Sequence, residues 1–148
     1  NLEGQAAALY WRTLFGPGFT REQENFTNAA LNYGYAVVRG IVARCLVGSG
    51  FVPCFGLHHN NQLNAFNLAD DLMEPFRPLV DLQAVNMPLP GTTQLSPQHK
   101  ADLLSLLVKE YSFDGQQRTL LNICEQITAS LGQATEQKDF RLLKLFVL

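Results

Sequence analysis

The segment TNAALNYGYAVVRGIVARCLVG, residues 27–48, contains the pattern that decides the fold class. Its large apolar side chains recur every three or four residues, which is the spacing of one helix face. The residues of this face are Leu31, Tyr35, Val38, Val42 and Leu46. Ala30, Val37 and Ile41 add a second apolar face, so we expect a buried helix at the centre of the fold. We expect Thr27 or Asn28 to cap it and Gly48-Ser49-Gly50 to end it.

Helical spacing also appears on both sides of this central segment. The other expected helices run over Leu2–Leu14, Leu68–Val85, Ser96 to about Glu110 and Gln117 to about Ala134. Pro75 and Pro78 lie inside the second of these, so we expect either a kink or two abutting helices there. Phe113-Asp114-Gly115 predicts a turn, and residues 142–148 form either a short strand or a helical end. The sequence therefore predicts an all-α fold, a helical bundle.

Composition limits the class of protein. The 148 residues are 47% hydrophobic and 16% charged, which predicts one globular domain over residues 1–148 rather than a disordered chain. The net charge of −2 does not favour nucleic-acid binding, although a local basic groove is enough for phosphate contacts. Three widely spaced cysteines without a Cys-x-x-Cys pair argue against a zinc ribbon or a disulfide framework.

Location and chain context are also indicated by the sequence. No apolar run reaches the ~20 residues of a membrane span, because Arg39 and Arg44 interrupt the best candidate. No signal peptide opens the chain, so we expect a cytoplasmic protein with no membrane partner. The chain begins with Asn1 and enters a helical pattern almost at once. We therefore expect it to be a fragment of a longer chain.

Two neighbouring stretches carry the residues best suited to chemistry: GLHHN, residues 56–60, and DDLMEPFRP, residues 70–78. Asp71 and Glu74 are three apart, and Asp70 and Glu74 are four apart, so either pair shares a helix face. A loop histidine that folds back onto this face would complete a mixed nitrogen and oxygen site, which suits manganese or magnesium. An acidic pair on a helix is also typical of a solvated surface. A His-His doublet is likewise typical of a loop in which the histidines form local hydrogen bonds.

Four motifs resemble the CRISPR-associated nucleases that integrate new spacers, the Cas-one family. The motifs are LEGQAA at residues 2–7, NAALNYGY at 28–35, GLHH at 56–59 and LADDLMEPFRP at 68–78. They span residues 2 to about 81, and their wording is most similar to members from type II systems. The resemblance implies the helical C-terminal catalytic domain of that family. The family's N-terminal β domain, through which its members dimerise, is absent from this sequence.

The resemblance also implies roles for individual residues. Glu3, His59 and Glu74 match the family's metal ligands, for Mn²⁺ or Mg²⁺, and Asp71 matches a second acidic position beside the metal. The family pattern Gly-x-x-His selects His59, and His58 then either forms a local hydrogen bond or approaches DNA. These four matched residues form the predicted catalytic set.

Further residues are candidates for support and for DNA contact. A metal-bound histidine needs a partner for its other ring nitrogen, and we expect Asn60 or Asn64 to serve. Arg77 either orients Glu74, contacts a phosphate or forms a structural ion pair. Contacts to the DNA backbone must come from basic side chains. The candidates, besides Arg77, are Arg12 and Arg44, with Arg21, Arg39 and Lys100 unranked.

The resemblance implies a metal-dependent DNA endonuclease and integrase of CRISPR adaptation. A 3′-hydroxyl of a short duplex would attack a phosphodiester at the repeat boundary, and hydrolysis would give nuclease activity. The implied partners are double-stranded prespacer and repeat DNA, a second copy of the full-length protein and the small Cas-two family protein. Two alternatives stay open: a catalytically silent scaffold of an adaptor complex, and a helical metal-dependent phosphohydrolase. The second lacks support, because the sequence contains no His-Asp dipeptide.

Overall fold

A computed structural model of the chain describes residues 2–147, except for the side chain of Glu3. The elements are α1 (Leu2–Phe15), α2 (Phe26–Gly48), α3 (Asn67–Met73), the 3₁₀ helix η1 (Glu74–Phe76), α4 (Arg77–Val85), α5 (Pro97–Leu104), η2 (Ser105–Leu107), β1 (Glu110–Phe113), β2 (Gln116–Thr119), α6 (Leu120–Gln137) and η3 (Phe140–Leu142). The predicted all-α class is confirmed, since the described strands form a single two-stranded hairpin.

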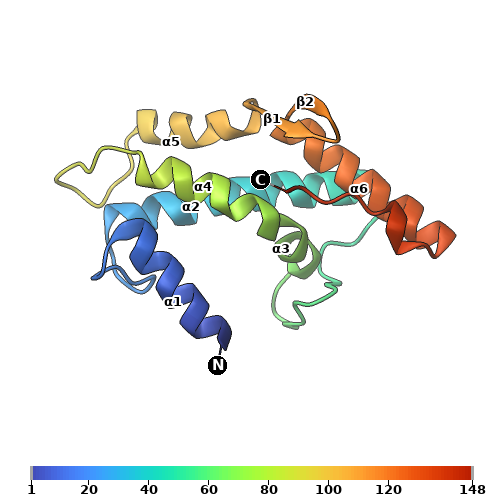
Figure 1. Ribbon diagram of the computed structural model, residues 1–148, viewed down its shortest axis with the longest axis horizontal. Helices are drawn as coiled ribbons and strands as arrows, with labels where there is room; N and C mark the ends of the chain where they lie inside the picture. Colours follow the sequence, from blue (N-terminus) through green and yellow to red (C-terminus); the bar gives the residue numbers. More distant parts are fainter. Residues whose placement is uncertain (1, 148) are drawn as a thin grey trace.

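Helix α2 is the central element, as its two apolar faces predicted. It packs against α3, α4, α5 and α6, and Figure 1 shows it running through the middle of the molecule between them. Leu31, Val38, Val42 and Leu46 are almost fully buried along its length. At Gly34 the packing leaves no room for a side chain, because an added Cβ would lie 2.4 Å from Cγ1 of Val80 on α4.

The start of α2 differs from the prediction. The helix begins at Phe26 and its cap is Asn25, whose side chain accepts a hydrogen bond from the backbone N–H of Asn28. The predicted caps Thr27 and Asn28 were therefore wrong. Asn28 is buried inside the first turn, and its amide donates to the carbonyl oxygens of Thr20 and Gln23 at 2.8 Å. Its polar atoms thus hold the α1–α2 loop against the helix.

The proline-containing segment divides as expected. Helix α3 ends at Met73, one 3₁₀ turn follows, and α4 begins at Arg77. Pro75 lacks the N–H that would continue the α-helical hydrogen-bond ladder, and Pro78 takes an early position in α4, where no such donor is needed. Glu74 therefore lies at the junction between two helices.

The predicted helix start at Ser96 is confirmed. The predicted end of this helix near Glu110 and the predicted start of the next at Gln117 were wrong. Ser96 and His99 form a reciprocal capping box at the start of α5. The α-helix stops at Leu104, and residues 110–119 form the β1–β2 hairpin instead of helix ends. Asp114 and Gly115 at the predicted turn both have positive φ, which a two-residue hairpin turn requires. Helix α6 then begins after Thr119, its cap.

The C-terminal tail combines η3 with extended chain, and Leu148 lies outside the described residues. Helix α1 lies at the edge of the bundle (Figure 1) and is anchored at its C-terminal end. There Trp11 and Phe15 lie against each other and against Phe19, with ring centroids 4.7–5.9 Å apart. Tyr10, the residue before Trp11, is 41% exposed. Among the described residues, none of the helices has the length and apolar character needed to cross a membrane.

Candidate metal centre

The loop between α2 and α3, residues 51–66, is folded tightly against the start of α3. Asn67 is buried and its amide donates to the carbonyl oxygens of Cys54 and Asn61, at 3.0 and 2.9 Å. The N–H of Leu68 donates to the carbonyl oxygen of Pro53 at 2.7 Å. The loop therefore has a defined shape, although its sequence contains no helix or strand pattern.

Asp71 is the centre of this loop's hydrogen bonding. Its Oδ2 accepts from the backbone N–H groups of Leu57 and His58, at 2.5 and 3.0 Å. Its Oδ1 accepts from the backbone N–H of His59 at 3.0 Å and lies 2.6 Å from Nδ1 of the same residue. One carboxylate thus holds three consecutive residues of the loop and also orients the imidazole of the third.

Gly56 makes this wrapping sterically feasible. A Cβ at this position would lie 2.2 Å from the carbonyl oxygen of His59 and 3.0 Å from Oδ2 of Asp71. No real Cβ approaches backbone that closely, so any other residue would push the loop off the carboxylate. The glycine of the Gly-x-x-His pattern is therefore explained by packing within the loop.

The charge state of Asp71 follows from these contacts. Burial alone would raise the pKa of this carboxyl. The hydrogen bonds from the backbone of His58, His59 and Leu57 and from the His59 ring outweigh burial, so the pKa falls below its ordinary value. An ionised carboxylate only accepts hydrogen bonds, so Nδ1 of His59 is the protonated nitrogen. In the neutral ring, Nε2 then carries the lone pair that a metal ion requires.

The predicted partner of the His59 ring was wrong. Asp71 holds Nδ1, whereas Asn64 donates to Oδ2 of Asp70 at 2.7 Å, and Asn60 forms no described side-chain hydrogen bond. A carboxylate attracts the N–H of an imidazole more strongly than an amide oxygen does. His58, by contrast, uses only its backbone N–H on Asp71, and its ring lies edge-on to the His59 ring at 5.6 Å.

Glu74 occupies a more open position than Asp71. Its side chain is 48% exposed, against 8% for Asp71, and Oε1 accepts from Nε of Arg77 at 2.8 Å. Of the three roles predicted for Arg77, the ion pair with Glu74 is therefore present. The Arg77 guanidinium also lies over the ring of Tyr35, 4.8 Å from its centroid.

A small polar cavity of about 230 Å³ adjoins this ion pair, between α2 and the α3–α4 segment. Arg77 and Arg39 both line it, together with Asn32, Tyr35 and Asp70. Arg39 lies over the ring of Phe66 at 4.9 Å and only loosely against Asp70, with 4.0 Å between Nη1 and Oδ1. Sequence reasoning did not rank Arg39, because its place beside the acidic helix depends on how α2 and α3 cross.

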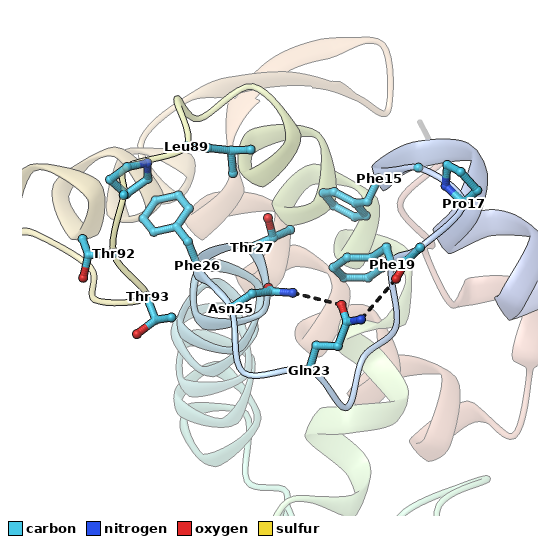
Figure 2. A pocket seen from close by; sticks show the side chains of 14 residues that line it. Phe15, Pro17, Phe19, Gln23, Asn25, Phe26, Thr27, Leu89, Thr92 and Thr93 are labelled. Atoms are coloured by element: carbon cyan, nitrogen blue, oxygen red, sulfur yellow. Dashed lines mark hydrogen bonds between the residues drawn. The ribbon is translucent and has the colours of Figure 1, made fainter.

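Arg44 and Arg12, the other two main candidates for DNA contact, do not line this cavity. Arg44 lines a separate hollow beside Cys45 and Glu125, where α2 meets α6. Arg12 is exposed in the last turn of α1, beside Trp11 and Phe19. A larger cavity of about 580 Å³ contains none of the predicted site residues; Figure 2 shows Phe15 and Phe19 on one side of it and Phe26 and Leu89 on the other.

The predicted three-ligand metal site is not assembled from the residues described. Glu3 belongs to α1, but its side chain lies outside the described part of the structure. Among the side chains that are described, no three His, Cys, Asp or Glu residues gather closely enough to hold an ion. The structure thus shows an oriented histidine and an accessible carboxylate, which are the donor types that Mn²⁺ and Mg²⁺ bind.

The structure is thus a helical bundle with an oriented histidine on a loop and an exposed carboxylate at a helix junction. Comparisons with known proteins identify the family of this bundle. The family model for CRISPR associated protein Cas1 matches residues 1–99. The CRISPR-associated endonuclease Cas1 of Neisseria meningitidis serogroup C (strain 8013) is 43% identical over 147 residues, covering 98% of this chain and 48% of that protein. The chain belongs to the Cas1 family.

Two further matches extend the comparison. CRISPR-associated endonuclease Cas1 1 of Pyrobaculum aerophilum is 36% identical over 114 residues, which is 74% of this chain and 38% of that protein. The solved structure "Casposase bound to integration product" matches with a TM-score of 0.73 and 22% identity, over 97% of this chain and 48% of that one. That likeness shows a shared fold. The chain spans about half the length of its Neisseria relative and of the casposase.

Proposed function

We propose that this chain is the helical catalytic part of a metal-dependent DNA endonuclease and integrase of CRISPR adaptation. The observation that carries the proposal is the Asp71–His59 pair in the loop before α3. A carboxylate that holds one imidazole nitrogen while the other is left to bind is the usual environment of a metal-bound histidine. Membership of the Cas1 family, whose Neisseria relative is named an endonuclease, agrees with this chemistry.

The proposed ligands are Nε2 of His59 and the carboxylates of Glu74 and Glu3. Glu74 is suited to this role because it is exposed at a helix junction and pairs with a single arginine. Asp71 supports the site by orienting His59. Bound Mn²⁺ or Mg²⁺ would polarise a phosphodiester and stabilise the leaving oxygen of a transesterification or hydrolysis.

The arginines of the polar cavity are the proposed phosphate contacts. Arg77 and Arg39 present guanidinium groups to the same cavity, next to Glu74. The rings of Tyr35 and Phe66 lie behind them, which limits the rotamers of both arginines. A DNA strand held by these charges would have its phosphate beside the proposed ligands.

The wider assembly is proposed from family membership. The complete protein would act in the cytoplasm on double-stranded prespacer and repeat DNA, as a homodimer joined by a Cas2 partner. The casposase of matching fold was solved bound to its integration product, which is consistent with DNA as the substrate.

The decisive experiment compares His59→Ala, Glu74→Ala and His58→Ala in the complete protein. His58 is a matched control, because it neighbours His59 and its ring makes no hydrogen bond to Asp71. We expect the first two variants to lose Mn²⁺-dependent DNA cleavage and integration by at least about 100-fold, since each removes a proposed ligand. The His58→Ala variant should stay within a few-fold of the wild type.

Circular dichroism of each variant checks that the helices are intact, and a Mn²⁺-dependent thermal shift reports metal binding separately. A scaffold would show neither the thermal shift nor cleavage in the wild type. Full activity of either His59→Ala or Glu74→Ala would reject the site assignment. Loss of activity in His58→Ala alone would mean that His58, rather than His59, binds the metal.

A further inference from the structure

A buried carboxylate away from the proposed ligands joins three helices. Asp81 on α4 is 2% exposed, and each of its oxygens accepts a hydrogen bond from a different tyrosine. Tyr10 of α1 donates to Oδ2 at 2.6 Å, and Tyr35 of α2 donates to Oδ1. Burying a carboxylate is costly unless it is fully hydrogen-bonded, so this arrangement calls for an explanation beyond core packing.

The bond from Tyr10 is important because α1 has little else to position its first half. The apolar side chains of Leu2 and Leu9 are exposed, and so are the residues between Gly4 and Ala8. Packing of Trp11 and Phe15 secures only the C-terminal end of the helix. Within the described side chains, Tyr10 makes the one hydrogen bond that links α1 to α4.

The spacing of the residues connects this bond to the proposed metal centre. Glu3 lies seven positions before Tyr10 on α1, and Glu74 lies seven positions before Asp81 on the α3–α4 segment. On α1, seven residues are two helical turns, about 10 Å, and return to nearly the same face. On the other segment, the 3₁₀ turn Glu74–Phe76 precedes α4. In Figure 1 both segments lead in the same general direction, with their N-terminal ends toward the side of the 51–66 loop. The contact of Tyr10 with Asp81 thus ties α1, the helix that carries position 3, to the segment that carries Glu74.

We infer that Asp81, with Tyr10 and Tyr35, is a positioning group that holds α1 at the angle and register at which Glu3 joins the metal centre. The inference rests on the proposed function, because it assigns Glu3 the role of a ligand. Tyr35 of α2 holds the carboxylate of Asp81 in place, and the hydrogen bond from Tyr10 attaches α1 to that carboxylate. Asp81 does not touch the substrate or the metal in this scheme; it acts through the helix that carries Glu3.

The test is a double-mutant cycle on Mn²⁺ affinity in the complete protein, measured by isothermal titration. The variants are Tyr10→Phe, Glu3→Ala and the two together, with Tyr111→Phe as control. Tyr111 is a partly buried tyrosine whose hydroxyl donates to the carbonyl oxygen of Leu106, and it belongs to the distant β1 strand. Tyr10→Phe removes only one hydroxyl from a partly exposed residue, so the protein should still fold.

We expect Tyr10→Phe to weaken Mn²⁺ binding about tenfold, the equilibrium effect of one hydrogen bond to a charged acceptor. In the Glu3→Ala background the same change should have almost no further effect, because the ligand that it positions is gone. Hydrogen exchange should become faster in α1 and stay unchanged in α2 and α6. The Tyr111→Phe control should bind Mn²⁺ like the wild type.

Equal Mn²⁺ affinity of Tyr10→Phe and the wild type would overturn this inference while leaving the proposed function intact. So would a tenfold loss that persists in the Glu3→Ala background, since the effect would then not pass through Glu3. Absence of Mn²⁺ binding by the wild-type protein would reject the proposed function itself, and the positioning role with it.

Discussion

Replacing Asp71 by Asn tests the loop most directly, because the side chain keeps its size and loses one acceptor oxygen and its charge. The asparagine oxygen can still accept from the backbone N–H groups of Leu57 and His58, as Oδ2 of Asp71 does. The amide NH₂ then replaces Oδ1 and faces the backbone N–H and Nδ1 of His59. One backbone donor is left without an acceptor, and two hydrogen bonds lose their charged partner.

The expected cost is about 2–3 kcal/mol of unfolding free energy at neutral pH, from one unsatisfied donor and two weakened bonds. Urea unfolding followed by circular dichroism measures this change. The amide also donates to Nδ1 of His59, so the neutral ring must move its proton to Nε2. We therefore expect the imidazole tautomer to invert in Asp71→Asn, which ¹⁵N NMR of the ring detects directly, and Mn²⁺ binding through Nε2 to be lost.

Two results would refute this account of the loop. One is an unfolding free energy within about 0.5 kcal/mol of the wild type, the range of ordinary surface substitutions. The other is a His59 ring that keeps its proton on Nδ1 in the Asp71→Asn variant. The first result would mean that Asp71 does not control the shape of the loop. The second would mean that Asp71 does not control the protonation of the His59 ring.

Other predictions follow from single contacts. Because the pKa of Asp71 is lowered in the folded state, its stabilising effect is complete above the ordinary carboxyl pKa and is lost as the pH falls through the lowered value; a urea series from pH 7 to pH 2 should show this loss in the wild type and less of it in Asp71→Asn. Gly34→Ala places a Cβ 2.4 Å from Val80 and should cost about 1–3 kcal/mol, whereas Gly40→Ala, with open space around it, should be neutral or stabilising. Ser96→Ala removes the cap of α5 and should cost about 1 kcal/mol, read from the same urea curves.

The helices were predictable because each carries its own periodicity and its own end signals. The buried α2, the break at Pro75 and the start at Ser96 all follow from local rules that the structure obeys. The hairpin at residues 110–119 was missed because its second strand, QQRT, has no apolar alternation to distinguish it from a helix start. The Asp114-Gly115 pair was the available signal, since this dipeptide favours a two-residue hairpin turn.

At the candidate site, the sequence predicted that a histidine loop lies beside an acidic helix, but it did not predict the contacts between them. Spacing placed a histidine loop next to an acidic helix, and the structure joins His59 to Asp71. Spacing did not reveal that Asp71 would accept three backbone hydrogen bonds, because those depend on the conformation of a loop without regular structure. The same limit applies to Asp81, whose partners Tyr10 and Tyr35 lie 71 and 46 positions away along the chain. Such pairings depend on how the helices pack.

The two acids of the DLME motif show why burial must be known before a role is assigned. From the sequence, Asp71 and Glu74 are equivalent carboxylates one turn apart on the same helix face. In the fold, Asp71 is covered by the loop and each of its oxygens already accepts two hydrogen bonds, so it has little capacity left for an ion. Glu74, displaced outward where α3 gives way to η1, keeps an exposed carboxylate. The proline that follows Glu74 thus separates an acid that shapes the histidine loop from an acid whose carboxylate stays accessible.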